Sequence, residues 1–318
     1  MAALVERGMS RAQKYIFDTA GYLVIRGALN DAEVDAANAA IDSHISDLHE
    51  RKNELRCNSL YDRKSSALEG DGKTGRFDMA GMLAWPSPHC TPFRDLLVHP
   101  SLRPVLNEVL GAGYRLDHSP LVIGMQKGSN GHTLHGGAID PSSNQPAWNI
   151  AYECRNQAIR AQLLTVSVAL TDVNAGDGGF CVVPGSHKSN FIPPAELRHF
   201  EEYTEMVQQP VLKKGDVLFF TEAALHGTLP WTSDLPRRAL LYRFSPATMA
   251  YGRGYSPSWA PEITAGMTPA QLAVMEPPYN LRMNRPSVDS DTGEMVQPQP
   301  RASFKVEFDE KVFGTKYY

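Results

Sequence analysis

From residue 115 onward the chain consists of short apolar runs separated by turn-forming residues, and this alternation constrains the fold more than any other feature. The runs are rich in β-branched and aromatic residues, and clusters of Gly, Pro, Asn and Asp bound them. They cover residues 121–125, 163–171, 180–183, 216–220 and 238–244. Regularly spaced short strands with turns between them are typical of a β-sandwich or β-barrel. The sequence therefore predicts a mainly β protein.

The segments on either side of this β-rich region have a different pattern. Residues 11–50 predict a helix, a short strand at 22–26 and a second helix whose apolar residues recur at helical spacing. Residues 93–110 predict a helix that ends at Gly111. Near the C-terminus little periodicity remains, apart from a strand predicted near 303–308. Helices are therefore expected to flank the β core.

The chain has 318 residues and no internal repeat, and we expect a single domain over residues 1–318. Its expected parts are N-terminal helices and a strand at 1–114, a barrel core at 115–246 with a lid-like loop at 136–160, and an irregular C-terminal wrap at 247–318.

Charge and composition exclude several classes of protein. The chain has 31 Lys and Arg residues and 35 Asp and Glu residues, so its net charge is −4, which disfavours a nucleic-acid-binding surface. No apolar run approaches the roughly 20 residues needed to cross a bilayer, and the N-terminus is too charged for a signal peptide. The four cysteines form no CxxC pair, so a zinc ribbon is excluded. We expect a soluble protein in a reducing, cytoplasmic setting.

Two of the ten histidines stand at strand edges in the β-rich region. His135 lies in the sequence LHGG and His226 in the sequence LHGT. Two imidazoles from distant strands of one barrel can meet on a metal ion, and two histidines with open positions are typical of oxygen-activating iron sites. For either histidine alone, a hydrogen-bonded structural role is the alternative.

Arg237 follows His226 by eleven residues, at the start of a predicted strand. A buried Arg holds a carboxylate with two parallel hydrogen bonds. A dicarboxylate co-substrate could therefore chelate the metal at one end and meet Arg237 at the other. The neighbouring Arg238 would point to the opposite face of the strand, so at most one of the two can line the site. The alternative for Arg237 is a solvated charge at a strand end.

Several segments in combination resemble the phytanoyl-CoA dioxygenase (PhyH) family. They are GYLVIRG at 21–27, ALTDV at 169–173, GGFCVVPGSHK at 178–188, GDVLFF at 215–220, HGT at 226–228 and RRAL at 237–240. The resemblance covers about residues 12–246, and it is specific as a combination rather than in any one piece.

This resemblance implies a double-stranded β-helix, or cupin-like jelly roll, that binds Fe(II) and 2-oxoglutarate. It implies that His135 and His226 ligate iron, that Arg237 binds the far carboxylate of 2-oxoglutarate, and that the Thr228 hydroxyl supports that contact. The implied activity is oxidation of an unactivated C–H bond of a small molecule, with 2-oxoglutarate decarboxylated to succinate. Hydroxylation is the expected outcome.

The sequence departs from the family at the third metal ligand. The family has Asp or Glu two residues after the first histidine, whereas this chain has Gly137 there. Such a site leaves one more coordination position open and resembles halogenating relatives, in which chloride binds the metal instead. Asp140 or Glu153 could reach in from a loop, although neither has the family's spacing. The remaining alternative is a jelly-roll protein that keeps the fold for binding and has lost catalysis.

The polar segment 136–160 is long for a loop in a compact domain, and in this fold it would border the substrate opening as a lid. Within it, Trp148 and Tyr152 are candidates for stacking on a substrate, and Arg76 is a candidate for the other side of the opening. Packing under the loop is the alternative for both aromatic residues.

Overall fold

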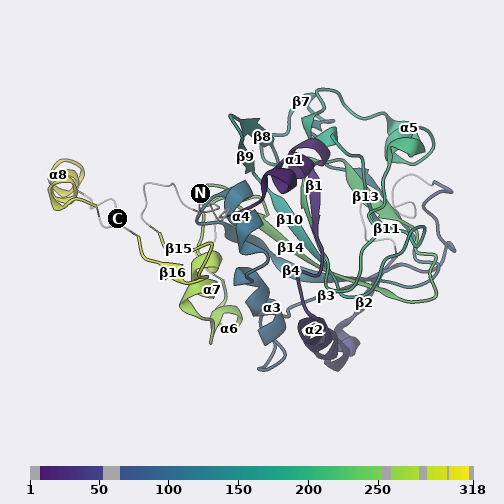
Figure 1. The fold of residues 1–318 in the computed structure, drawn as a ribbon, viewed down its shortest axis with the longest axis horizontal. Helices are drawn as coiled ribbons and strands as arrows, with labels where there is room; N and C mark the ends of the chain where they lie inside the picture. The colour runs from purple at the N-terminus through teal and green to yellow at the C-terminus, as the bar shows by residue number, and fades with distance from the viewer. Residues whose placement is uncertain (1–7, 53–64, 253–258, 279–284, 299–300, 315–318) are drawn as a thin grey trace, which may run out of the picture.

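The computed structural model describes residues 8–52, 65–252, 259–278, 285–298 and 301–314. Two antiparallel sheets form its centre (Figure 1). The larger sheet has the order β1 (Tyr22–Ile25), β12 (Val217–Thr221), β10 (Leu164–Ala169), β14 (Arg237–Ser245), β4 (Arg115–Met125), β3 (Arg76–Ala80) and β2 (His49–Arg51). The smaller sheet has the order β11 (Gly179–Val182), β13 (His226–Leu229) and β5 (His132–His135).

The five predicted apolar runs all form strands, and they are β4, β10, β11, β12 and β14. Every residue of β10 is buried, because the strand lies between β12 and β14 in the middle of the large sheet. Burial on both faces explains why the sequence of this strand is continuously apolar rather than alternating. The prediction of a mainly β protein is confirmed.

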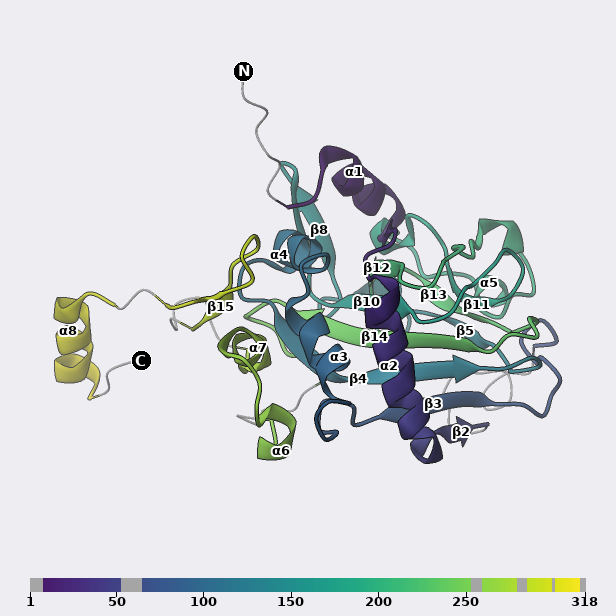
Figure 2. The same cartoon turned by 60° about the horizontal axis from the view of Figure 1, so that its bottom comes forward.

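Helices cover one face of the large sheet: α1 (Arg11–Ala20), α2 (Asp31–Ser43), α3 (Thr91–Asp95) and α4 (Arg103–Leu110) (Figure 2). The predicted order of helix, strand and helix over residues 11–50 is confirmed. The side chain of Asn30 accepts a hydrogen bond from the Glu33 N–H, and Glu33 accepts one from the Asn30 N–H. This capping box starts α2 at the predicted position.

The stretch 93–110 is not one helix, contrary to the prediction, because the chain is interrupted between α3 and α4. His99 has extended backbone with ψ 135°, since the proline that follows it disfavours the helical conformation. The second helix starts again at Arg103 and ends at Gly111, as predicted.

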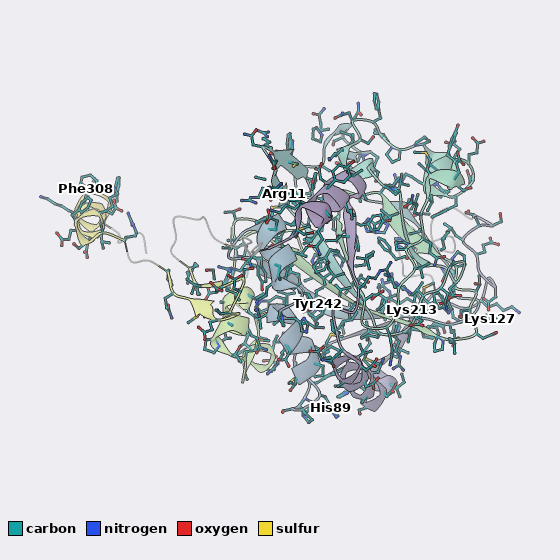
Figure 3. All side chains as sticks on the ribbon, in the orientation of Figure 1. Arg11, His89, Lys127, Lys213, Tyr242 and Phe308 are labelled. Carbon is teal, nitrogen blue, oxygen red and sulfur yellow. The ribbon has the colours of Figure 1, made fainter. Side chains whose placement is uncertain are left out.

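The main hydrophobic core lies between the helices and the large sheet. On β14 the outward residues Leu240, Tyr242 and Phe244 belong to this core. The Tyr242 hydroxyl donates a hydrogen bond of 2.7 Å to the carbonyl of Phe93 in α3, and Figure 3 shows Tyr242 in the middle of the molecule. Alternate residues of β14 face the opposite way, between the two sheets.

Residues 136–160 form short hairpins rather than one long loop. β6 (Ile139–Asp140) pairs with β7 (Gln145–Pro146), and β8 (Tyr152–Arg155) pairs with β9 (Ala158–Ala161). The chain beyond 246 contains α6 (Pro261–Thr264), α7 (Pro269–Met275), β15 (Ser287–Val288), β16 (Met295–Val296) and α8 (Ser303–Phe313). Among the described helices, none combines the length and the apolar character needed to cross a lipid bilayer.

The strand predicted near 303–308 is wrong, because α8 occupies this segment. Phe304, Phe308 and Val312 recur every four residues, and Lys305 pairs with Asp309 at 2.8 Å across one turn. The helix stands away from both sheets in Figures 1 and 2, and Figure 3 shows Phe308 on it. Over the six residues 303–308 apolar and polar residues alternate as in a strand. Over the eleven residues of α8 the apolar residues have helical spacing.

Candidate active site

The two histidines singled out in the sequence face each other across the small sheet. His135 is the last residue of β5 and His226 is the first residue of β13, and the two are direct register partners. Their ring centroids are 4.2 Å apart. Strand pairing therefore brings together two side chains that are far apart in the sequence.

Both histidines are oriented by the same local hydrogen bond. His135 Nδ1 lies 3.0 Å from the Thr133 carbonyl oxygen, and His226 Nδ1 lies 2.8 Å from the Ala224 carbonyl oxygen. A carbonyl can only accept, so each Nδ1 carries a proton and donates it. Each Nε2 is then available to a metal, which is the usual arrangement of metal-binding histidines.

The surroundings keep both imidazoles neutral. Burial lowers the pKa of His226, and burial lowers the pKa of His135 well below its usual value. The His226 ring also lies against Phe220 and Phe180, with ring centroids 4.6 Å and 6.1 Å away. Neutral imidazole is the form that binds metal ions.

Arg237 is 5% exposed and extends from β14 into the space between the sheets. Within the described part of the chain no carboxylate pairs with it. Its Nε has no hydrogen-bond partner there, and Nη1 contacts Met125 Sδ at 3.7 Å. Burial, with the nearby charge of Arg76, lowers the pKa of Arg237 to about 10. A buried guanidinium without a partner is a site for an anion.

Arg238 faces the other way, as the strand alternation predicts. It donates hydrogen bonds to Asp42 at 2.5 Å and to Asn38 at 3.1 Å, both on α2. Thr228 lies two residues after His226 on β13, opposite Phe180, and therefore on the same face of the strand as His226.

The position of the missing carboxylate is open. A Cβ built on Gly137 would have no neighbour closer than the Ile139 carbonyl oxygen at 3.9 Å, and the Gly137 φ angle is +104°. Asp140 accepts hydrogen bonds from Ser142 and Ser143 in its own turn, and Glu153 pairs with Arg155 on β8. Among the described residues, no group of three or more His, Cys, Asp or Glu side chains encloses a metal-sized position.

A carboxylate that the sequence analysis did not single out lies beside the histidines. Glu222 directly follows β12 and is 8% exposed, and its Oε2 lies 3.6 Å from His226 Nε2. Its Oε1 accepts hydrogen bonds from Thr165 Oγ1 and, at 2.8 Å, from Arg243 Nε. Burial alone would raise the pKa of Glu222, but the charge of Arg243 and the hydrogen bonds from Thr165 and Arg243 hold it well below its usual value. The family pattern places the carboxylate after the first histidine, whereas Glu222 precedes the second, His226, by four residues.

The three residues expected at the substrate opening have other surroundings. Trp148 is 68% exposed. The Tyr152 hydroxyl donates to Asp18 of α1 at 2.7 Å. Arg76 makes two hydrogen bonds, of 2.7 Å and 2.6 Å, to Asp78 on the same strand.

An apolar cavity of about 540 Å³ lies next to Gly137. The sequence analysis did not anticipate it, and none of the three opening residues lines it. Its walls include Gly137, Ala138, Val183, Phe191, Leu197 and Leu225.

The fold and the site define a class of protein: a jelly roll with a histidine pair and a buried arginine between its sheets. Solved structures share this fold. HygX from Streptomyces hygroscopicus with iron bound is 22% identical, with a TM-score of 0.59, over 77% of this chain and 90% of that chain. The α-ketoglutarate-dependent epimerase SnoN from nogalamycin biosynthesis is 20% identical, with a TM-score of 0.51, over 77% and 86% of the two chains.

The family model of phytanoyl-CoA dioxygenase (PhyH) matches residues 17–239. This chain therefore belongs to the PhyH family, and the jelly-roll prediction is confirmed. A further HygX structure, with nickel, 2-oxoglutarate and hygromycin B bound, is 22% identical, with a TM-score of 0.58, over 76% of this chain and 90% of that chain. No curated protein matches the chain.

Proposed function

We propose that the protein is an Fe(II)/2-oxoglutarate-dependent oxygenase that hydroxylates a C–H bond of a small molecule. One observation carries the proposal: His135 and His226 are paired across β5 and β13 with neither Nε2 hydrogen-bonded within the described residues, and Arg237, which has no carboxylate partner among them, lies on the neighbouring sheet. Family membership and the iron, nickel and 2-oxoglutarate in the HygX structures support it. A cytoplasmic location stays a prediction.

The residues fit these two groups chemically. His135 and His226 would hold iron through neutral Nε2 atoms. Arg237 would hold the far carboxylate of 2-oxoglutarate, because it is a buried cation without a carboxylate among the described residues. Thr228 would add a hydroxyl from the same face of β13 as His226. When bound, iron and 2-oxoglutarate supply the oxygen activation that side chains cannot provide.

The chain itself contributes orientation and exclusion of water. The bonds to the Thr133 and Ala224 carbonyls set the direction of the two imidazoles, and Phe180 and Phe220 shield His226. The cavity beside Gly137 has the size of a small-molecule site and mostly apolar walls. We propose that the substrate presents apolar surface there.

Halogenation is the second candidate function, and the open position at Gly137 favours it. A glycine supplies no oxygen to the metal, and nothing lies within 3.9 Å of the Cβ position. A chloride ion could take that place. Loss of catalysis with retention of the fold is the third alternative.

An anaerobic titration of the full-length protein with Fe(II) and then 2-oxoglutarate tests these functions. We expect a metal-to-ligand charge-transfer band that chloride does not change, and succinate formation when oxygen is added. A band that chloride shifts, with the response lost in Gly137→Asp, would support halogenation. A protein that binds neither Fe(II) nor 2-oxoglutarate would contradict the proposal and leave a non-catalytic role.

A further inference from the structure

Glu222 is a buried carboxylate beside the histidine pair, and the departure at Gly137 leaves the site one carboxylate short. We propose that Glu222 is the third protein ligand to iron and replaces the carboxylate that Gly137 cannot provide. This inference rests on the proposed function, because it concerns the same metal.

The two oxygens of Glu222 have different environments. Thr165 and Arg243 both donate to Oε1. Oε2 receives no hydrogen bond from the described residues, and it lies 3.6 Å from His226 Nε2. Arg243 and Thr165 thus hold the carboxylate in place through one oxygen and leave the other directed at the histidine.

The separation of 3.6 Å is too long for a hydrogen bond between Oε2 and Nε2. His226 carries its proton on Nδ1, which donates to Ala224, so two electron-pair donors face the same space. Ligand atoms at neighbouring positions around a metal, each about 2.1 Å from it, lie about 3 Å apart. The described side chains do not by themselves enclose a metal-sized position, so a cation between Oε2 and Nε2 would have to draw these two atoms together, by well under 1 Å, roughly the difference between those separations.

The local backbone explains how the carboxylate arrives from this side. A Cβ on Gly136 would lie 2.5 Å from the Glu222 carbonyl oxygen and 2.7 Å from that of Ala224, and the Gly136 φ angle is +81°. The absence of a side chain at position 136 therefore lets the end of β5 pack directly on the turn that carries Glu222. The donor comes from the connection between β12 and β13 instead of from β5.

This arrangement also bears on chloride. Oε2 brings a negative charge to the neighbourhood of His226 Nε2, whereas Arg243 pairs with the other oxygen, Oε1. A chloride ion on the same metal would meet that charge, so the proposal favours oxygen chemistry over halogenation at this site.

The test compares metal affinities of full-length variants by Fe(II) titration without oxygen and by the EPR signal of free Mn(II). Glu222→Gln keeps the size of the side chain and removes its charge, and we expect it to weaken the binding of both metals by more than about a hundredfold, above the range for residues that only orient a ligand. Asp140→Asn and Glu153→Gln are the matched controls and should change neither affinity.

Equal metal affinity in the wild type and Glu222→Gln, with loss in His135→Ala, overturns the Glu222 inference and leaves the proposed function standing. Failure of the wild type to bind Fe(II) overturns the proposed function itself. If Glu222→Gln does not fold, Glu222→Asp replaces it: the charge stays, the oxygen withdraws, and unchanged affinity overturns the inference.

Discussion

The two ends of β14 each bring an arginine into the space between the sheets, but the two arginines have different partners. Arg243 donates to the buried Glu222 at 2.8 Å. Arg237 is 5% exposed and has no carboxylate partner in the described part of the chain. The strand has the same alternation at both ends, so secondary structure does not distinguish them.

The presence or absence of a carboxylate partner distinguishes a structural arginine from one that is available to bind a ligand. A buried cation costs solvation free energy, and a protein carboxylate offsets this cost when the chain folds. Burial lowers the pKa of Arg237, whereas the charge of Glu222 more than offsets burial and raises the pKa of Arg243. An uncompensated cation is a site where an anionic ligand gains most.

The largest effect, on iron retention, is expected at the pair of histidines on the small sheet. His135→Ala and His226→Ala should each abolish iron retention, because each removes one of two neutral nitrogens. His44→Ala is the control, since His44 stacks on Trp85 with ring centroids 3.9 Å apart. Iron content measured after desalting checks this, and equal content in all three variants would contradict the assignment.

The comparison of the arginines predicts opposite effects on the stability of the metal-free protein. Arg243→Leu leaves the Glu222 charge buried and unpaired, and it should lower the free energy of unfolding by about 2–4 kcal/mol. Arg237→Leu removes a charge that has no partner, so that free energy should stay the same or rise. Urea unfolding measures both, and equal destabilisation would remove the distinction.

For 2-oxoglutarate binding the order of the two arginines is reversed, and substitution of Arg237 should have the larger effect. A bidentate carboxylate contact contributes about 1.5–3 kcal/mol, so Arg237→Leu should weaken 2-oxoglutarate binding by about tenfold to a hundredfold. Arg238→Leu, on the outward face, should have a much smaller effect. Anaerobic titration of the iron-loaded protein measures this, and greater sensitivity at Arg238 would show that the wrong residue was assigned.

His187 is a third buried basic side chain, and unlike the two arginines it can lose its proton. His187 is buried, its Nδ1 has no partner among the described residues, and burial lowers its pKa to about 4. Below about pH 6.5, the ordinary pKa of histidine, His187 binds a proton in the unfolded chain. In the folded chain its ring stays neutral until about pH 4. Stability should therefore fall as pH drops through this window, by about 1 kcal/mol per pH unit from this residue.

Urea unfolding at several pH values measures this slope. His187→Gln should flatten it, whereas the exposed His49→Gln should not. An unchanged slope in His187→Gln would show that this ring titrates normally in the folded protein.

Local pattern predicted much of the fold. The five apolar runs became strands, Asn30 became a helix cap, and Arg237 and Arg238 took opposite faces. These features depend on residues within a few positions of one another. The interruption of 93–110 was also readable, because a residue before proline resists helix. The window at 303–308 was too short to distinguish a strand from α8.

The local pattern of residues shows which side chains are available: a histidine at the edge of each of two strands, an arginine on the inward face of β14, and a glycine where the family has a carboxylate. The tertiary structure is needed to show which of these side chains lie close together. Glu222 lies 3.6 Å from His226 because β13 returns beside β5 and the turn after β12 packs on Gly136. Contacts of this kind depend on register and on the path of turns between sheets, and neither leaves a periodic signal in the residues themselves.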